Sequence, residues 1–103
     1  MISQLRIYTV NRGMMDQWVK LFSEFIVPVQ ESLGMKIDAM WVNEDKNQVI
    51  WSRSYSDAED VEAADATWGA STDWQALREN ARSHIARLEV ITMNAVARVP
   101  VEA

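Results

Sequence analysis

The chain has 103 residues, a formal net charge of −5 and no cysteine. This length suits one domain with one core, so we expect a single domain over residues 1–103. The missing thiols exclude disulfides, thiolate metal sites and a cysteine nucleophile. The acidic balance argues against nucleic acid and against an anionic membrane surface as partners. No transmembrane stretch or signal-peptide pattern is present, so a cytoplasmic location is expected.

The N-terminal segment, residues 2–10, predicts a strand because its side chains alternate between two faces. Leu5 and Ile7 fall on one face, and Arg6 and Tyr8 fall on the other. We expect the helices to cover the face of Leu5 and Ile7. Arg6 and Tyr8 would then lie on the opposite, uncovered face of the sheet.

Residues 14–33 carry apolar side chains at spacings of three and four, which predicts a long amphipathic helix. Gly34 is a natural stop after it. Pro28 removes a backbone donor and crowds the preceding turn. A kink or a break near Phe25 is therefore expected.

Two further strands are predicted over residues 35–43 and 48–55, joined by a polar turn. The residues that share one face of the second of these strands are Val49, Trp51, Arg53 and Tyr55. The residues on its other face are Ile50, Ser52 and Ser54.

The C-terminal part predicts a split helical segment followed by a last strand. Asp57 and Asp60 resemble a capping box at the start of one helix. Ser71 or Thr72 would cap the next helix. The last strand is expected over residues 88–99, where apolar and polar side chains alternate.

The predicted order is βαββαβ, which indicates an α+β, ferredoxin-like fold with an antiparallel sheet and helices on one face. The uncovered sheet face, with Arg6, Tyr8 and large apolar side chains, calls for a partner. Symmetric homodimers are the commonest oligomers, so we expect two copies to pack face to face as a dimeric α/β barrel.

Five segments resemble those of a known family in their order and spacing. The segments are Leu5-Arg6-Ile7-Tyr8-Thr9-Val10, Ile26-Val27-Pro28-Val29, Gly34-Met35-Lys36-Ile37, Glu59-Asp60 with Glu62-Ala63-Ala64, and Thr72-Asp73-Trp74. This pattern is similar to the NIPSNAP family of the dimeric α/β-barrel superfamily, from about residue 5 to residue 82. The resemblance implies the barrel and the homodimer. It does not imply one established reaction.

The candidate ligand-binding residues are Arg6, Tyr8, Trp51, Arg53 and Tyr55. A guanidinium and a phenol can bind an anionic or carbonyl oxygen of a small ligand. The alternative for Arg6 is an ion pair across the dimer, for example with Glu89. For the aromatic residues the alternative is packing in the core or the interface.

Other aromatic and polar residues are expected to serve structure. Trp18 and Trp74 lie at helical spacing and Trp41 lies on a strand, so all three are expected to pack in the core or an interface. The carboxylates of residues 57–65 fit a solvated helix face better than a cation site.

The single histidine, His84, could be a general base or a haem ligand, but it also suits the C-terminal end of a helix. Haem-degrading members of the superfamily use a histidine on the last helix. In this sequence Arg78, and not His84, stands nearer the position of that histidine, and a guanidinium does not bind iron. No phosphate loop, nucleophile elbow or zinc spacing is present. We therefore expect no metal and no cofactor.

Two functions remain open. The first is binding of a small aromatic or anionic molecule, with the possibility of cofactor-independent, monooxygenase-like catalysis, since superfamily relatives include such enzymes. That chemistry needs an apolar cavity with a few polar groups. The alternative is a non-enzymatic dimeric interaction module. An enclosed pocket lined by Arg6, Tyr8 and Trp51 would favour the first function, and a solid interior would favour the second.

Overall fold

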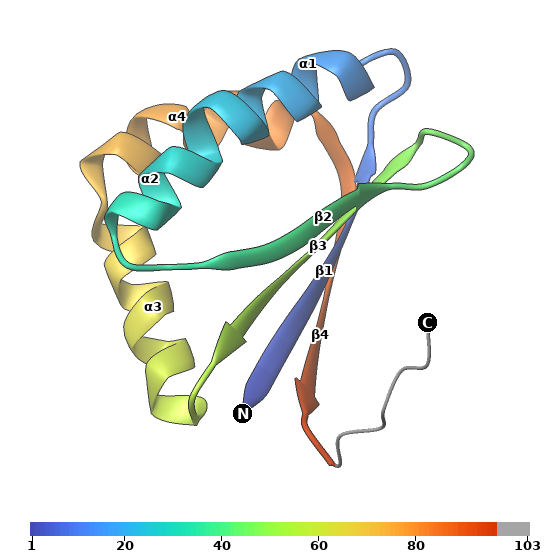
Figure 1. Ribbon diagram of the computed structural model, residues 1–103. Coiled ribbons are helices and arrows are strands. Elements are labelled where there is room, and N and C mark those ends of the chain that lie inside the picture. The colour runs from blue at the N-terminus through green and yellow to red at the C-terminus, as the bar shows by residue number, and fades with distance from the viewer. Residues whose placement is uncertain (97–103) are drawn as a thin grey trace.

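The structure is a computed structural model that describes residues 1–96. Its elements are β1 Ile2–Val10, α1 Met15–Leu21, a π-helical turn Phe22–Ile26, α2 Val27–Ser32, β2 Ile37–Val42, β3 Gln48–Tyr55, α3 Ala58–Ala70, α4 Thr72–Ser83 and β4 Ile85–Asn94. The strands form one antiparallel sheet in the order β2-β3-β1-β4. All four helices lie on one side of this sheet (Figure 1). The predicted α+β, ferredoxin-like fold is confirmed.

The first helical segment is interrupted where the sequence predicts a break. Pro28 has no N–H to donate to the carbonyl four residues earlier, and a wider π-helical turn precedes it. The buried side chains that follow one another at spacings of four are Trp18, Phe22, Ile26 and Gln30. Four residues exceed one α-helical turn by about 0.4 residues, so a regular helix would rotate these side chains apart. The wider turn keeps them on the side that faces the sheet.

The second helical segment is split into α3 and α4, each with the predicted cap. The Asp57 carboxylate accepts a hydrogen bond from the Asp60 backbone N–H at 3.0 Å, and the Ser71 hydroxyl accepts one from the Trp74 N–H at 3.2 Å. Each cap satisfies a backbone donor that has no helical acceptor. No helix within residues 1–96 is long and apolar enough to cross a membrane.

The last strand begins earlier than the sequence predicts. β4 starts at Ile85 instead of residue 88, directly after α4. Two hydrogen bonds from Asn11 hold the C-terminal end of α4 against the end of β1. The Asn11 N–H donates to the His84 carbonyl at 2.7 Å, and the Asn11 side chain donates to the Ser83 carbonyl at 2.9 Å. The part of the predicted strand beyond residue 96 lies outside the described residues.

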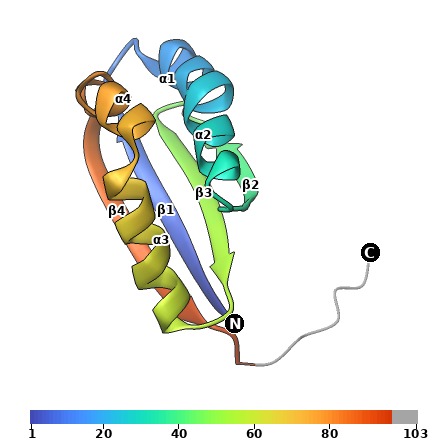
Figure 2. The same ribbon diagram turned by 90° about the vertical axis from the view of Figure 1, so that its left-hand side faces the viewer.

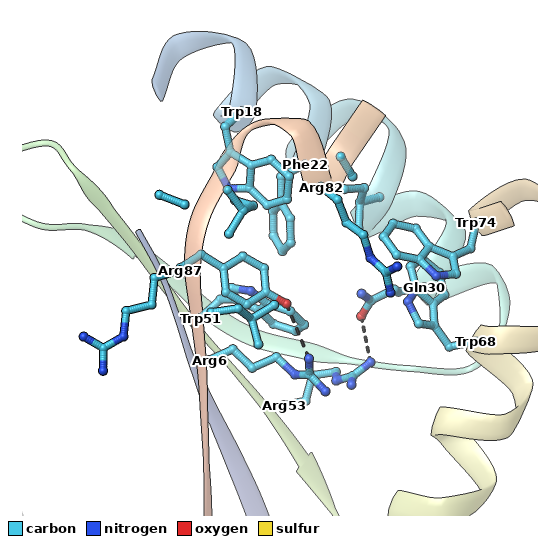
Figure 3. A pocket seen from close by; sticks show the side chains of 16 residues that line it. Arg6, Trp18, Phe22, Gln30, Trp51, Arg53, Trp68, Trp74, Arg82 and Arg87 are labelled. Atoms are coloured by element: carbon cyan, nitrogen blue, oxygen red, sulfur yellow. Dashed lines mark hydrogen bonds between the residues drawn. The ribbon is translucent and has the colours of Figure 1, made fainter. Parts of the chain in front are cut away.

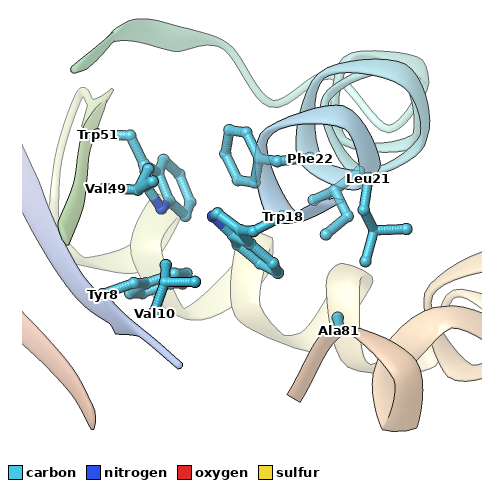
Figure 4. Close-up of a cluster of buried hydrophobic side chains, with 9 residues drawn as sticks. Tyr8, Val10, Trp18, Leu21, Phe22, Val49, Trp51 and Ala81 are labelled. Carbon is cyan, nitrogen blue, oxygen red and sulfur yellow. The ribbon is translucent and has the colours of Figure 1, made fainter. Parts of the chain in front are cut away.

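The hydrophobic core lies between the sheet and the helices, on the sheet face that carries Tyr8 and Trp51 (Figure 4). The expectation that Arg6 and Tyr8 lie on the uncovered face is wrong. Arg6 is paired with Trp51 in the β1–β3 register, and paired residues project to the same face. The apolar side of the helices packs on this sheet face. The aromatic rings of this face bury more apolar area than the aliphatic side chains of the other face.

The opposite sheet face carries no helix, and several of its large apolar side chains are exposed. Trp41, Ile91 and Met93 on it are 52%, 44% and 39% exposed. Leu5 and Ile7, which were expected to contact the helices, lie on this face and are half-buried. Trp41 is therefore outside the core of the chain, although a place in an interface remains a prediction.

Candidate ligand-binding pocket

A cavity of about 460 Å³ lies between the sheet and the helices. The aromatic residues that line it are Tyr8, Trp18, Phe22, Trp51, Trp68 and Trp74. The polar residues that line it are Arg6, Gln30, Arg53, Arg82 and Arg87. Figure 2 shows α1 and α2 over the β3 side of the sheet and α3 and α4 over the β4 side. Small-molecule sites commonly have volumes of roughly 300–1,000 Å³, so the cavity is of suitable size.

The cavity brings together most of the residues that the sequence singles out. The predicted ligand-binding residues in its lining are Arg6, Tyr8, Trp51 and Arg53. Tyr55 is not among the lining residues; its ring centroid lies 5.6 Å from the Arg53 guanidinium carbon. Burial raises the pKa of Tyr55, although the Arg53 charge acts in the opposite direction. The phenol is therefore neutral at neutral pH.

Trp51 forms the centre of the cavity floor and is 1% exposed. Its ring meets Tyr8 edge-on with centroids 5.9 Å apart, and it lies 5.2 Å from Phe22. Trp18 contacts both of these neighbours, at 5.8 Å from Tyr8 and 5.6 Å from Phe22. The four rings thus form a closed, well-packed group that is both core and cavity wall.

Arg53 reaches the cavity from β3 and is 2% exposed. Its Nη1 donates to Gln30 Oε1 at 3.1 Å, and its guanidinium carbon lies 5.2 Å from the Trp51 ring centroid. Its one ion pair within residues 1–96 is long, 3.9 Å to Asp65, whose side chain is 55% exposed. Burial lowers the pKa of Arg53, and the nearby Arg6 charge lowers it further. The Arg53 charge is therefore poorly compensated.

Arg6 extends from β1 beside Arg53 (Figure 3), and its guanidinium carbon lies 5.3 Å from the Trp51 ring centroid. It donates to Gln4 Oε1 at 3.2 Å and weakly to the Tyr8 hydroxyl at 3.4 Å. Glu89, the proposed structural partner, is paired with Arg87 on the other sheet face. Within the described chain Arg6 therefore has neutral hydrogen-bond partners. The expected ion pair with Glu89 across a dimer does not fit, because Arg6 projects to the helix-covered face and Glu89 lies on the uncovered one.

Several buried polar atoms at this site have no hydrogen-bond partner among residues 1–96. The atoms that belong to lining residues are Arg6 Nε, Trp18 Nε1, Trp51 Nε1 and Arg53 Nε. Guanidinium and indole groups donate hydrogen bonds and accept none. The cavity is therefore rich in donors and poor in acceptors.

Sequence reasoning did not identify most of the other lining residues as pocket residues. Trp68 and Trp74 are stacked, with centroids 4.7 Å apart and planes at 24°, and together they form a wall from α3 and α4. Arg82 points into the cavity from α4, whereas Arg87 points away from it (Figure 3). Gln30 also lines the cavity, and its position carried a usable signal, because this glutamine continues the buried line of helix positions spaced by four.

His84 does not line this cavity. It is 5% exposed, and its Nδ1 lies 2.7 Å from the Asn80 carbonyl oxygen, at the end of α4. Arg78 is exposed on α4 and is also absent from the lining. Among residues 1–96 no cluster of three histidine or carboxylate side chains is placed to hold a metal ion. The absence of a metal and a cofactor remains a prediction.

Solved structures with this fold include two bacterial NIPSNAP proteins. An uncharacterised NIPSNAP domain protein from Burkholderia xenovorans superposes with a TM-score of 0.89 at 17% identity, over 98% of this chain and 100% of that chain. A NIPSNAP family protein from Agrobacterium tumefaciens superposes with a TM-score of 0.88 at 21% identity, over 98% of each chain. At this identity the likeness shows the fold alone.

A more distant likeness extends to an oxygenase. SnoaB, a cofactor-independent oxygenase from Streptomyces nogalater, superposes with a TM-score of 0.73 at 14% identity, over 97% of each chain. No curated protein matches the chain. The model of the NIPSNAP family matches residues 3–100. The chain therefore belongs to the NIPSNAP family.

Proposed function

We propose that this protein binds a small aromatic or anionic molecule in the cavity between its sheet and its helices. The observation that carries the proposal is the cavity itself, with aromatic walls and a few convergent donors. That combination is typical of small-molecule sites, in which apolar walls supply affinity and polar groups fix orientation. A purely structural module has no need for poorly compensated guanidinium groups beside a cavity, since they cost stability.

The enzymatic form of this proposal is a cofactor-independent, monooxygenase-like reaction. Its support is the fold shared with SnoaB, together with a cavity whose aromatic rings could position a planar substrate. The donors of Arg6 and Trp51 would hold a substrate oxygen. Oxygen uptake with 1,5-dihydroxynaphthalene, in protein freed of metal and flavin, tests this form. No uptake above the protein-free rate with this and related electron-rich aromatics would contradict it.

The binding proposal is tested by calorimetric titration with 1-naphthoate and 1-naphthamide, a planar acid and its neutral amide. We expect at least one of them to bind at one molecule per chain. Ala86 lines the cavity, so Ala86→Phe should weaken binding about tenfold or more by filling space. Ala76 is exposed on α4 outside the lining, and Ala76→Phe is the matched control. Absence of binding by both compounds, or equal loss in both variants, would contradict the proposal.

We also propose that two copies associate through their uncovered sheet faces as a dimeric α/β barrel. Exposed apolar side chains on that face support this assembly, because large apolar patches are rarely left in contact with water. The alternative function, a non-enzymatic dimeric interaction module, would use the same assembly but would leave the cavity without a ligand.

A further inference from the structure

We propose, resting on the binding function above, that the ligand is an aromatic anion. Its planar apolar body would lie among the cavity rings, and its one anionic oxygen group would be held by Arg6 and Arg53. The first support is the local charge. The chain has 15 acidic residues and a net charge of −5, yet the arginines Arg6, Arg53 and Arg82 face the cavity and none of the described acidic residues lines it. The cavity is therefore positively charged, whereas the protein as a whole is negatively charged.

The second support is the set of unpartnered donors. The Nε atoms of Arg6 and Arg53 and the indole nitrogens of Trp18 and Trp51 are buried without acceptors in the described chain. A buried donor without an acceptor is costly, and these donors belong to residues that line the cavity, so a small side-chain movement would let them donate to an acceptor on a ligand. An oxygen that accepts several hydrogen bonds at once meets this need, and a carboxylate does so best because each oxygen offers two lone pairs.

The third support is the state of the two guanidinium groups in the empty cavity. Both lie against the Trp51 ring, so two like charges share one buried wall. The available counter-charge, Asp65, is half-exposed and sits 3.9 Å from Arg53. A ligand anion between Arg6 and Arg53 would compensate both charges at close range. Asp65 would then act as a weak competitor that the ligand displaces.

The aromatic part of the ligand follows from the remaining walls. Trp51 covers the sheet side, and the stacked Trp68 and Trp74 rings stand on the helix side. An inorganic anion would satisfy the arginines but leave these walls without contacts. A neutral aromatic molecule would fill the walls but leave the guanidinium groups uncompensated. Only a molecule with both parts matches the whole cavity.

The test compares 1-naphthoate with 1-naphthamide by calorimetry on the wild-type protein at low ionic strength. We expect the acid to bind about 10- to 100-fold more tightly, the ratio that hydrogen bonds to a charged group provide. Equal affinities would overturn the anion proposal and leave the binding function standing. Binding by neither compound would overturn both. This comparison needs no variant, so it cannot be confused with misfolding.

Three variants test whether the anionic group of the ligand binds between Arg6 and Arg53. Arg6→Gln should lower the affinity for 1-naphthoate about tenfold or more and change that for 1-naphthamide little. Arg78→Gln, on α4 outside the cavity, is the matched control and should change neither. Asp65→Asn should tighten 1-naphthoate binding by about two- to fivefold, because a competing carboxylate is removed. If Arg6→Gln weakens both compounds equally, or if Asp65→Asn weakens the acid, the anion does not lie at these arginines.

Discussion

The contact between Arg53 and Gln30 joins β3 to α2 at the inner end of the cavity. Both side chains are 2% exposed, and Arg53 donates to Gln30 at 3.1 Å. The hydrogen bond between them therefore offsets the cost of burying each polar group. The contributions of the two side chains to the free energy of unfolding should be coupled.

This coupling is measurable with a double-mutant cycle. Gln30→Leu leaves a buried guanidinium N–H without its acceptor, and Arg53→Leu leaves a buried amide oxygen without its donor. Each single change should lower the free energy of unfolding by about 1–3 kcal/mol. The double variant should lose less than the sum of the two, because no partner is abandoned. Urea unfolding gives the three values, and strict additivity would contradict the coupling.

At the level of residues, the sequence singled out four of the residues that line the cavity and missed others. Alternation along β1 and β3 grouped Arg6, Tyr8, Trp51 and Arg53 correctly, because side-chain direction in a strand follows directly from position. Trp68, Trp74 and Arg82 were not predicted in the cavity lining. Helical spacing identifies an inward side chain, but it does not distinguish a neighbour in the core from the wall of a cavity.

α3 is the least anchored of the helices. None of its side chains is fully buried, and its partly buried tryptophan, Trp68, lies on the cavity side. By contrast, the first helical segment buries residues along its whole length. A helix with few buried apolar contacts opens at a lower free energy than one that is packed throughout. α3 therefore forms the weakest wall of the cavity.

Hydrogen exchange should detect this difference. We expect the backbone amides of α3 to exchange faster than those of α1 and of β1, because local opening of α3 exposes little apolar surface. Saturating 1-naphthoate should slow the exchange in α3, since Trp68 would contact the bound ring. Amides of α3 that are as protected as those of β1 in the ligand-free protein would show that α3 is not the weak wall.

At the level of elements, the predictions succeeded where local chemistry decides. Pro28 marked the interruption of the first helical segment, and Asp57 and Ser71 marked the starts of α3 and α4. The start of β4 at Ile85 was predicted too late. That boundary depends on contacts with Asn11, which is distant in the sequence, and local patterns do not contain such information.

For the whole molecule, the sequence predicted the sheet and its helices but reversed the two sheet faces. Side chains alternate between the two faces of a strand, which puts Leu5 and Ile7 on one face and Arg6 and Tyr8 on the other. This alternation does not determine which of the two faces the helices cover. Leu5 and Ile7 look like core residues because both are aliphatic, while Arg6 looks like a surface residue. The covered face holds the larger aromatic rings, and the cavity accommodates the arginines among them. For the exposed apolar side chains of the uncovered face, our proposal is a role in assembly.

The assembly prediction is tested by placing a charge on each sheet face in turn. Ile91 lies on the uncovered face and is 44% exposed, while its neighbour Val90 projects to the helix side and is 41% exposed. If two sheets pack face to face, Ile91→Glu buries an unpaired carboxylate in the interface and should shift the protein to monomers. Val90→Glu introduces the same charge at similar exposure and should leave the dimer intact. Sedimentation at micromolar concentration measures both variants beside the wild type. A monomeric wild type, or equal dissociation in the two variants, would show that the uncovered sheet face is not the dimer interface.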